Sequence, residues 1–322
     1  MDQIQRSFAA IKRGKPIEAE DDNDRKIKRL HFLMGVKKEL VKKLAEYDKA
    51  VIKKIPKAKR SLAESVLGGS IDFVDIYFLD NAKAASKSVA RVIKKYNWQA
   101  TGFMISDELF ITNQHAIKKK EVASDYMIEF NYELGINKKP KDSTTFKLDP
   151  DKFFLSSHQN DLDYTIVAVG EKDMGPDNLS SFGFCPLSDA DDKHTKGEWV
   201  NIIQHPLGRL KQIVLRENRL AARSDKVLHY FTDTLGGSSG SPVFNDQFEP
   251  IGLHHYGGPS EEAFTPEGEP GPTNVNEGIR ISVIIKDVVD RKENELDENQ
   301  RDIIKKALNI PYRGPSLVQS NE

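Results

Sequence analysis

The chain has 322 residues, 38% hydrophobic and 30% charged, which is enough apolar material for one large domain with an appendage or for two domains. No stretch approaches about 18 consecutive apolar residues and no apolar run follows the first methionine, so the sequence supports neither a membrane span nor a secretion signal. Cys185 is the single cysteine, which excludes an intrachain disulfide and leads us to expect a reducing, cytoplasmic setting.

The net charge of −1 is divided unevenly along the chain. Residues 1–60 hold 18 Lys and Arg against 9 Asp and Glu, a net of +9, and the remainder therefore carries −10. This asymmetry indicates that the two parts have different roles.

Residues 1–70 are predicted to be an α-helical adaptor or regulatory region. Apolar positions recur every three or four residues over 24–50, and a second stripe runs over 51–67 across Pro56, which should kink it. The basic cluster at 53–60 has no interleaved aromatics, which favours a solvated helix face over a nucleic-acid surface. The apolar stripe must be buried on the rest of the chain or on a partner, and both remain open.

From Trp98 onward short β-prone runs replace the helical pattern, after a transitional segment in which residues 84–92 fit either a helix or a strand. Strands are predicted over residues 102–106, 109–112, 127–132, 164–169, 200–204, 212–215, 227–231, 242–244, 251–256 and 279–285. Irregular, short turns between them favour a barrel or a sandwich. Residues 259–277 are predicted to be an acidic loop, residues 287–308 one or two helices, and the chain after Pro311 disordered.

Residues 232–243 combine two adjacent glycines with a run of small hydroxyl residues. Such a loop can turn sharply, expose one serine and direct its own amides toward the same point. An ordinary turn between two strands has the same composition. Ser238, Ser239 and Ser241 all compete for the exposed position.

Two upstream residues supply the other groups needed for acyl transfer. His115 follows the apolar run 109–112, and Asp163 immediately precedes the apolar run 164–169. Asp161 competes for the carboxylate role, but only Asp163 adjoins the apolar run. The chain order of histidine, aspartate and serine is the one that the chymotrypsin arrangement uses.

With these motifs the chain resembles the trypsin-like (chymotrypsin-fold) serine peptidase domain proteins of bacteria and, more distantly, the glutamyl endopeptidases. The matching motifs are TGF at 101–103, LFITNQH at 109–115, DYTIV at 163–167, IQHPLG at 203–208, GSSGSP at 237–242, IGLHHYG at 251–257 and NEGIR at 276–280. The resemblance covers roughly residues 75–290, and the first 70 residues have no counterpart in it.

The resemblance implies a mainly β, chymotrypsin-like double β-barrel at 71–290, after an α-helical region at 1–70 and before a C-terminal helix and disordered tail at 291–322. It assigns Ser239 as nucleophile, His115 as base and Asp163 as the carboxylate that orients it, with the amides of Gly237 and Ser239 as the oxyanion hole. It implies a protein or peptide substrate and requires no metal or cofactor. Residues 1–70 could engage a regulatory protein; a membrane or nucleic-acid partner is not expected.

The specificity expectation is divided. The resemblance places Asp233 at the base of the primary specificity pocket. A carboxylate there favours cleavage after Arg or Lys, and we rank this preference first. Thr234 and His254 match positions that bind acidic side chains in glutamyl endopeptidases, and His255, Tyr256 and Gly257 complete the expected wall. If Asp233 pairs instead with a histidine (His205, His254 or His255), the pocket becomes small or neutral.

Ser238 occupies the position where zymogen-type trypsins carry an aspartate that pairs with a newly cut N-terminus. Activation by that route is therefore not expected, and control by residues 1–70 is the hypothesis that replaces it. The competing function is a catalytically latent or inactive trypsin-like fold that serves as a protein- or nucleic-acid-binding module.

Overall fold

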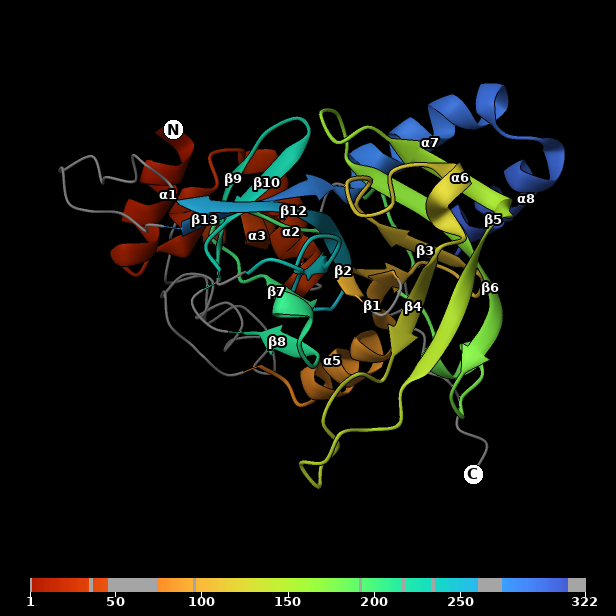
Figure 1. Ribbon diagram of the computed structural model, residues 1–322. Coiled ribbons are helices and arrows are strands. Elements are labelled where there is room, and N and C mark those ends of the chain that lie inside the picture. Colours follow the sequence, from red (N-terminus) through yellow and green to blue (C-terminus); the bar gives the residue numbers. More distant parts are fainter. Residues whose placement is uncertain are drawn as a thin grey trace.

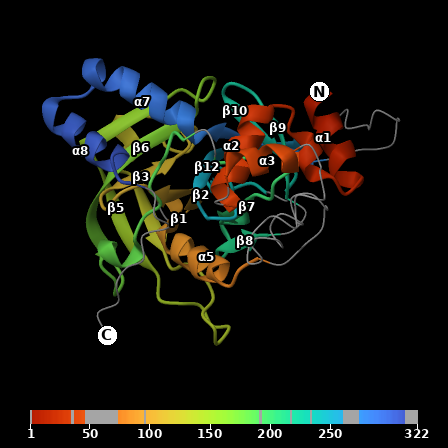
Figure 2. The same cartoon turned by 180° about the vertical axis from the view of Figure 1, so that it is seen from behind.

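The computed structural model describes residues 2–34, 37–45, 74–94, 97–190, 193–215, 218–232, 235–259 and 274–311. Two β-layers form its centre (Figures 1 and 2). The first is a closed six-stranded barrel in the order β1-β2-β3-β6-β5-β4, and the second is a curled seven-stranded sheet in the order β8-β7-β11-β12-β13-β10-β9. This is the chymotrypsin-like double barrel that the sequence predicts.

Antiparallel pairing builds both layers. The barrel strands are β1 (Val89–Lys94), β2 (Asn97–Met104), β3 (Leu109–Thr112), β4 (Tyr126–Phe130), β5 (Thr144–Ser157) and β6 (Tyr164–Met174). The sheet strands are β7 (Asn201–Gln204), β8 (Gln212–Val214), β9 (Leu220–Arg223), β10 (Val227–Tyr230), β11 (Pro242–Phe244), β12 (Pro250–Pro259) and β13 (Asn274–Arg280).

The helices lie outside these layers. They are α1 (Asp2–Lys12), α2 (Asn23–Met34), α3 (Lys38–Ala45), α5 (Tyr77–Ser88), α6 (Lys120–Ala123), α7 (Ile281–Glu295) and α8 (Glu298–Leu308), with short 3₁₀ turns η1 (Pro16–Ala19), η4 (Leu179–Phe182) and η5 (Pro206–Gly208). Within the described ranges, no helix is long and apolar enough to cross a membrane.

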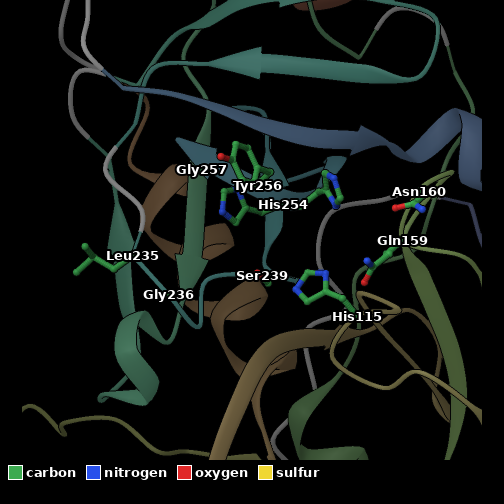
Figure 3. A pocket seen from close by; sticks show the side chains of 10 residues that line it. His115, Gln159, Asn160, Leu235, Gly236, Ser239, His254, Tyr256 and Gly257 are labelled. Atoms are coloured by element: carbon green, nitrogen blue, oxygen red, sulfur yellow. The ribbon is translucent and has the colours of Figure 1, made fainter. Parts of the chain in front are cut away.

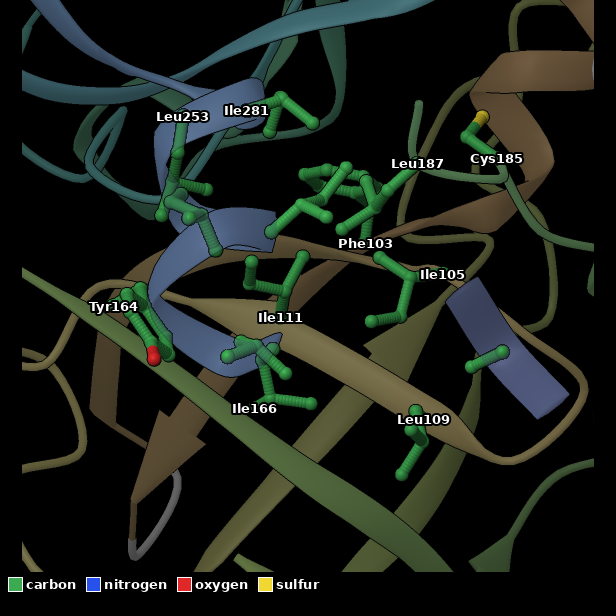
Figure 4. Close-up of a cluster of buried hydrophobic side chains, with 14 of the residues drawn as sticks. Phe103, Ile105, Leu109, Ile111, Tyr164, Ile166, Cys185, Leu187, Leu253 and Ile281 are labelled. Atoms are coloured by element: carbon green, nitrogen blue, oxygen red, sulfur yellow. The ribbon is translucent and has the colours of Figure 1, made fainter. Parts of the chain in front are cut away.

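One apolar cluster joins the barrel to the sheet (Figure 4). Ile111 and Ile166 contribute to it from the barrel, Leu253 from the sheet, and Ile281 and Ile284 from α7, all at most 2% exposed. Burial of each such side chain stabilises the fold by roughly 1.5–3 kcal/mol. Helix α7 therefore packs its buried side chains against the junction between the barrel and the sheet.

The predicted strand 279–285 is wrong beyond Arg280, where β13 ends and α7 begins. The buried positions of α7 are Ile281, Ile284, Ile285 and Val288, a helical spacing that a short β-branched run conceals. The expected boundary at 290/291 falls inside α7. Of the expected acidic loop, residues 274–277 form part of β13 and residues 260–273 lie outside the described ranges.

The sequence also missed strands β5 and β9, and the ambiguous segment 84–92 divides at residue 88 into the end of α5 and the start of β1. In β5 the buried positions alternate on either side of a break at Pro150 to Lys152, where a proline is followed by two exposed charged residues, Asp151 and Lys152. A proline inside a run argues against a strand, so the sequence pattern did not reveal β5. The helical prediction for residues 1–70 is confirmed in α1, α2 and α3, and its second stripe, 51–67, lies outside the described residues.

Helix α1 and the turn η1 pack against the seven-stranded sheet. Phe8 of α1 meets Phe231 edge to face at 5.8 Å. Gly197 has φ +89°, and a Cβ there would lie 2.0 Å from the carbonyl oxygen of Pro16. The close approach of these two backbones therefore needs glycine.

Ion pairs with buried members reinforce this contact. The fully buried Glu20 accepts from both terminal nitrogens of Arg223, at 2.8 and 3.2 Å. Arg29, 1% exposed, donates through Nε to Glu198 at 3.0 Å. A buried carboxylate is tolerated only with such partners, so the docking depends on each pair staying intact.

Replacing Arg223 with alanine leaves Glu20 buried without its bidentate partner, and we expect Arg223→Ala to lower the free energy of unfolding by about 3 kcal/mol. The matched control is Arg13→Ala, because Arg13 pairs with Glu18 at 3.6 Å and is 61% exposed; its expected cost is below about 1 kcal/mol. Urea unfolding of the two variants measures both values. Equal costs for the two variants would contradict the importance assigned to the buried pair.

Candidate functional site

His115 lies in the turn that follows β3, and side-chain bonds fix that turn. The Thr112 hydroxyl donates to the carbonyl of Thr101 at 2.7 Å, and the Asn113 amide donates to the carbonyl of Asp163 at 2.8 Å. The backbone N–H of His115 donates to Asp163 Oδ1 at 2.9 Å, and its ring Nδ1 lies 2.6 Å from Oδ2. The same carboxylate therefore holds both the backbone and the ring of His115.

Asp163 precedes β6 and is fully buried. Its φ of 40° lies in the left-handed region, which non-glycine residues adopt at a cost and often at functional sites. Burial alone would raise the pKa of Asp163, but the hydrogen bonds from His115 and His255 outweigh it, so the pKa is lowered and the carboxylate is ionised near neutral pH. The competitor Asp161 is 52% exposed and pairs with Lys226.

The loop that contains Ser239 joins the end of the β10 region to β11, and Thr101 of β2 holds its backbone. The Thr101 hydroxyl donates to the carbonyl of Gly237 at 2.8 Å, and the Thr101 N–H donates to the carbonyl of Ser239 at 2.9 Å. Gly237 and Gly240 have φ of +89° and +83°, which supply the sharp turns. Both carbonyls thus point toward β2.

The three serines of this loop differ in their surroundings. Ser238 and Ser241 are fully buried, and the Ser238 hydroxyl accepts from the backbone N–H of Leu235 at 3.3 Å. Ser239 is partly exposed and lines a pocket together with His115 (Figure 3). Ser239 is the one of these three serines that belongs to the described lining of the pocket.

The pocket has a volume of about 500 Å³. Its lining consists of His115, Gln159, Asn160, Leu235, Gly236, Ser239, His254, His255, Tyr256 and Gly257. The expected wall residues from His254 to Gly257 therefore reach one pocket with His115 and Ser239. Asp233 and Thr234 lie outside the described residues.

The histidines that Asp233 might have paired with have other partners. His254 is buried, its Nδ1 lies 2.8 Å from the Tyr230 hydroxyl, and burial lowers its pKa to about 3, so its ring is neutral. His205 Nδ1 lies 3.0 Å from the carbonyl of Arg209. His255 Nδ1 lies 2.6 Å from Asp163 Oδ2.

Sequence reasoning missed two features of this site. His255 was expected in the wall of the substrate pocket, yet it also contacts the buried carboxylate of Asp163. A β-bulge in β12, between His254 and Tyr256, makes this contact possible. Gln159 and Asn160 were not singled out; their nearness in the chain to Asp163 was the available signal.

The sequence is similar to one known protein family and to individual known proteins. Residues 100–253 match the trypsin-like peptidase domain family. Over 262 residues the chain is 35% identical to an uncharacterized protein, y4fB, of Sinorhizobium fredii, covering 71% of this chain and 39% of that protein. It is 29% identical over 196 residues to secreted RxLR effector protein 73 of Plasmopara viticola, covering 55% of this chain and 47% of that protein. The chain thus spans less than half the length of these two relatives.

Two solved structures share lower identity with the chain. A mutant of Rv3671c from M. tuberculosis H37Rv, in its inactive form, is 15% identical with a TM-score of 0.45, over 71% of this chain and 98% of that one. Deg5 is 13% identical with a TM-score of 0.42, over 65% and 90%. No glutamyl endopeptidase is among the proteins named here, and that finer resemblance stays a prediction.

Gly240 lies where β2, β3 and the serine loop meet: a Cβ there would lie 2.1 Å from the carbonyl oxygen of Thr101 and 2.4 Å from Thr112 Oγ1. We expect Gly240→Ala to cost the left-handed penalty of roughly 1–2 kcal/mol plus an overpacking cost of roughly 1–3 kcal/mol. Gly14, with φ +69° and nothing within 4 Å of its Cβ position, isolates the first cost. Chemical unfolding of Gly240→Ala and Gly14→Ala compares them, and equal losses would contradict the steric account.

Proposed function

We propose that the chain is a serine endopeptidase that hydrolyses peptide bonds through Ser239, His115 and Asp163. The observation that carries the proposal is the 2.6 Å contact between His115 Nδ1 and the carboxylate of the buried Asp163. The ring of His115 also lines the same pocket as Ser239. Because the carboxylate fixes Nδ1 as the protonated nitrogen, Nε2 is left as the basic nitrogen. The matched trypsin-like peptidase domain supports the same chemistry.

In the proposed reaction Ser239 attacks the scissile carbonyl while His115 Nε2 takes its hydroxyl proton. Asp163 stays ionised and stabilises the imidazolium that forms. His115 then gives the proton to the leaving amine, which departs from the tetrahedral carbon. A water molecule, deprotonated by His115, hydrolyses the acyl-enzyme and restores the serine.

The amides of Gly237 and Ser239 are the proposed oxyanion hole. Thr101 binds the two carbonyls of these residues, and no backbone hydrogen bond within the described ranges takes up either N–H. Two N–H groups in one turn suit the negative charge that develops on the carbonyl oxygen, where losing one donor typically costs about 10²–10³ in rate.

Residues 1–70 are proposed to recruit or regulate the peptidase through a protein partner. Helix α1 and η1 are committed to the sheet by the contacts of Phe8, Pro16 and Glu20. A regulator would therefore act on a region that is already packed against the strands of the peptidase domain.

The first test is labelling with a fluorophosphonate probe, which reacts with an activated serine. We expect Ser239-dependent labelling of the full chain, with Ser239→Ala unlabelled and His115→Ala slowed by about 10⁴-fold or more. Ser241→Ala is the control, because the Ser241 hydroxyl is buried without a hydrogen-bond partner among the described residues, and it should label normally. Wild-type protein that stays unlabelled would contradict constitutive activity. Labelling that then begins when a candidate partner is added identifies a latent enzyme, and labelling that never begins favours the binding module.

The second test concerns specificity, for which we keep cleavage after Arg or Lys as the first proposal. It depends on Asp233, since the described lining supplies imidazole and amide groups but no carboxylate. A peptide library should show cuts after basic residues that Asp233→Ser abolishes, while Ser241→Ala cuts as wild type does. Cuts after Glu or Leu, with Arg and Lys ignored, would reject this proposal.

A further inference from the structure

Asp163 has two histidine partners on one oxygen atom. The Nδ1 atoms of His115 and His255 each lie 2.6 Å from Asp163 Oδ2, and the two rings meet edge to face with centroids 6.4 Å apart. A carboxylate that is ionised can only accept, so both ring nitrogens donate an N–H to it. The buried charge of Asp163 is therefore divided between two imidazoles.

The array continues beyond His255. Its Nε2 lies 3.8 Å from Glu277 Oε1, and the other oxygen of Glu277 lies 3.0 Å from His229 Nε2. Strand pairing explains this second contact, because His229 of β10 and Glu277 of β13 are direct cross-strand partners. The titratable and charged groups around His255 are thus Asp163, Glu277, His115 and, beyond them, His229 and the neutral His254.

We propose that His255 is a positioning residue that orients Asp163 and makes the basicity of His115 depend on the charge of His255. The inference rests on the proposed peptidase function, and it adds a fourth side chain to that site. A charged His255 balances Asp163, so a second positive charge on His115 gains less from the carboxylate. A charged His255 therefore opposes the addition of a proton to His115.

The charge state required of His255 agrees with its surroundings. The hydrogen bond to Asp163 raises the pKa of His255, partial burial opposes the rise, and the nearby Asp163 and Glu277 charges add to it. His255 is therefore protonated over a range that extends above the usual pKa of histidine.

The three side chains His115, Asp163 and His255 also have the composition of a metal-binding group. Zinc bonds of about 2.0–2.1 Å at tetrahedral angles separate two ligand atoms by roughly 3.3 Å. Both nitrogen-to-oxygen distances are 2.6 Å, which suits charge-assisted hydrogen bonds and is too short for two ligands of one ion. The geometry therefore favours hydrogen bonds from His115 and His255 to Asp163 over coordination of a metal ion by the three side chains.

The test uses two variants of His255 in the full chain and the pH dependence of fluorophosphonate labelling. His255→Asn keeps an N–H donor near the Nδ1 position without a titratable charge, and His255→Ala removes both. For His255→Asn we expect the acid limb to move to higher pH by on the order of one unit, with a maximal rate within a few-fold of wild type. For His255→Ala we expect the same direction of shift and a maximal rate lowered about tenfold or more.

His31→Asn on α2, outside the site, is the control and should keep the wild-type profile. An acid limb of His255→Asn that coincides with wild type would overturn the proposal. So would a shift that treatment of wild type with a chelator reproduces, because a metal ion and not a shared proton would then hold the cluster.

A readout independent of activity separates this inference from the proposed function. In the Ser239→Ala protein, NMR of ¹⁵N-labelled histidines should show two strongly hydrogen-bonded Nδ1–H protons, one of which is lost in Ser239→Ala/His255→Asn. Two such signals in a protein whose wild type does not label would retain the shared carboxylate and reject the peptidase. A single signal with normal labelling would reject the role of His255 alone.

Discussion

The structure depends on one buried threonine where the barrel meets the sheet. Thr101 of β2 uses every polar group it has: its N–H and hydroxyl donate to the carbonyls of Ser239 and Gly237, its hydroxyl accepts from the N–H of His205, and its carbonyl accepts from Thr112. The residue is fully buried, so these bonds are not exposed to competition from solvent. Through it the turn of His115 and the loop of Ser239 are fixed to the same strand.

A second constraint is electrostatic. Asp163 is an ionised group with no exposed surface, held in a left-handed conformation, and neither feature is stable without compensation. Three N–H groups provide it, two from His115 and one from His255. The hydrogen bonds that stabilise the buried carboxylate also fix the tautomer of the His115 ring. The stability of the structure around Asp163 and the chemistry proposed for it therefore have one origin.

Much of the fold and of the site could be predicted from local sequence. His115, Asp163 and Ser239 each adjoin a β-prone run or a glycine turn, and their order along the chain predicts the double barrel. Strand β5 and the start of α7 could not be predicted in this way. Pro150 and the adjacent charged residues Asp151 and Lys152 break the alternation of β5. The ISVII run of α7 fits a strand as well as a helix until its packing between the barrel and the sheet is known.

Long-range pairings were also beyond the sequence. Nothing local connects Glu20 with Arg223, or His255 with Asp163, because both contacts depend on how distant strands and helices are placed. The N-terminal docking therefore became visible only with the structure.

His255 illustrates why the local pattern fails at this site. Strict alternation along β12 would place consecutive side chains on opposite faces of the sheet. The register slips between His254 and Tyr256, which pair with Gly278 and Glu277, so His255 is an extra residue in the strand. The backbone of His254 meanwhile binds the serine loop, donating to the carbonyl of Ser241 and accepting from Gly240.

That bulge lets three successive residues serve three sides of one site. The His254 ring turns into the interior against Tyr230, His255 turns to Asp163, and Tyr256, 62% exposed, is left on the pocket wall. A regular strand could not deliver all three, since its first and third side chains would share a face. The bulge next to the serine loop is thus the feature that brings a second imidazole to the carboxylate while the strand continues to bind the backbone of the loop that contains Ser239.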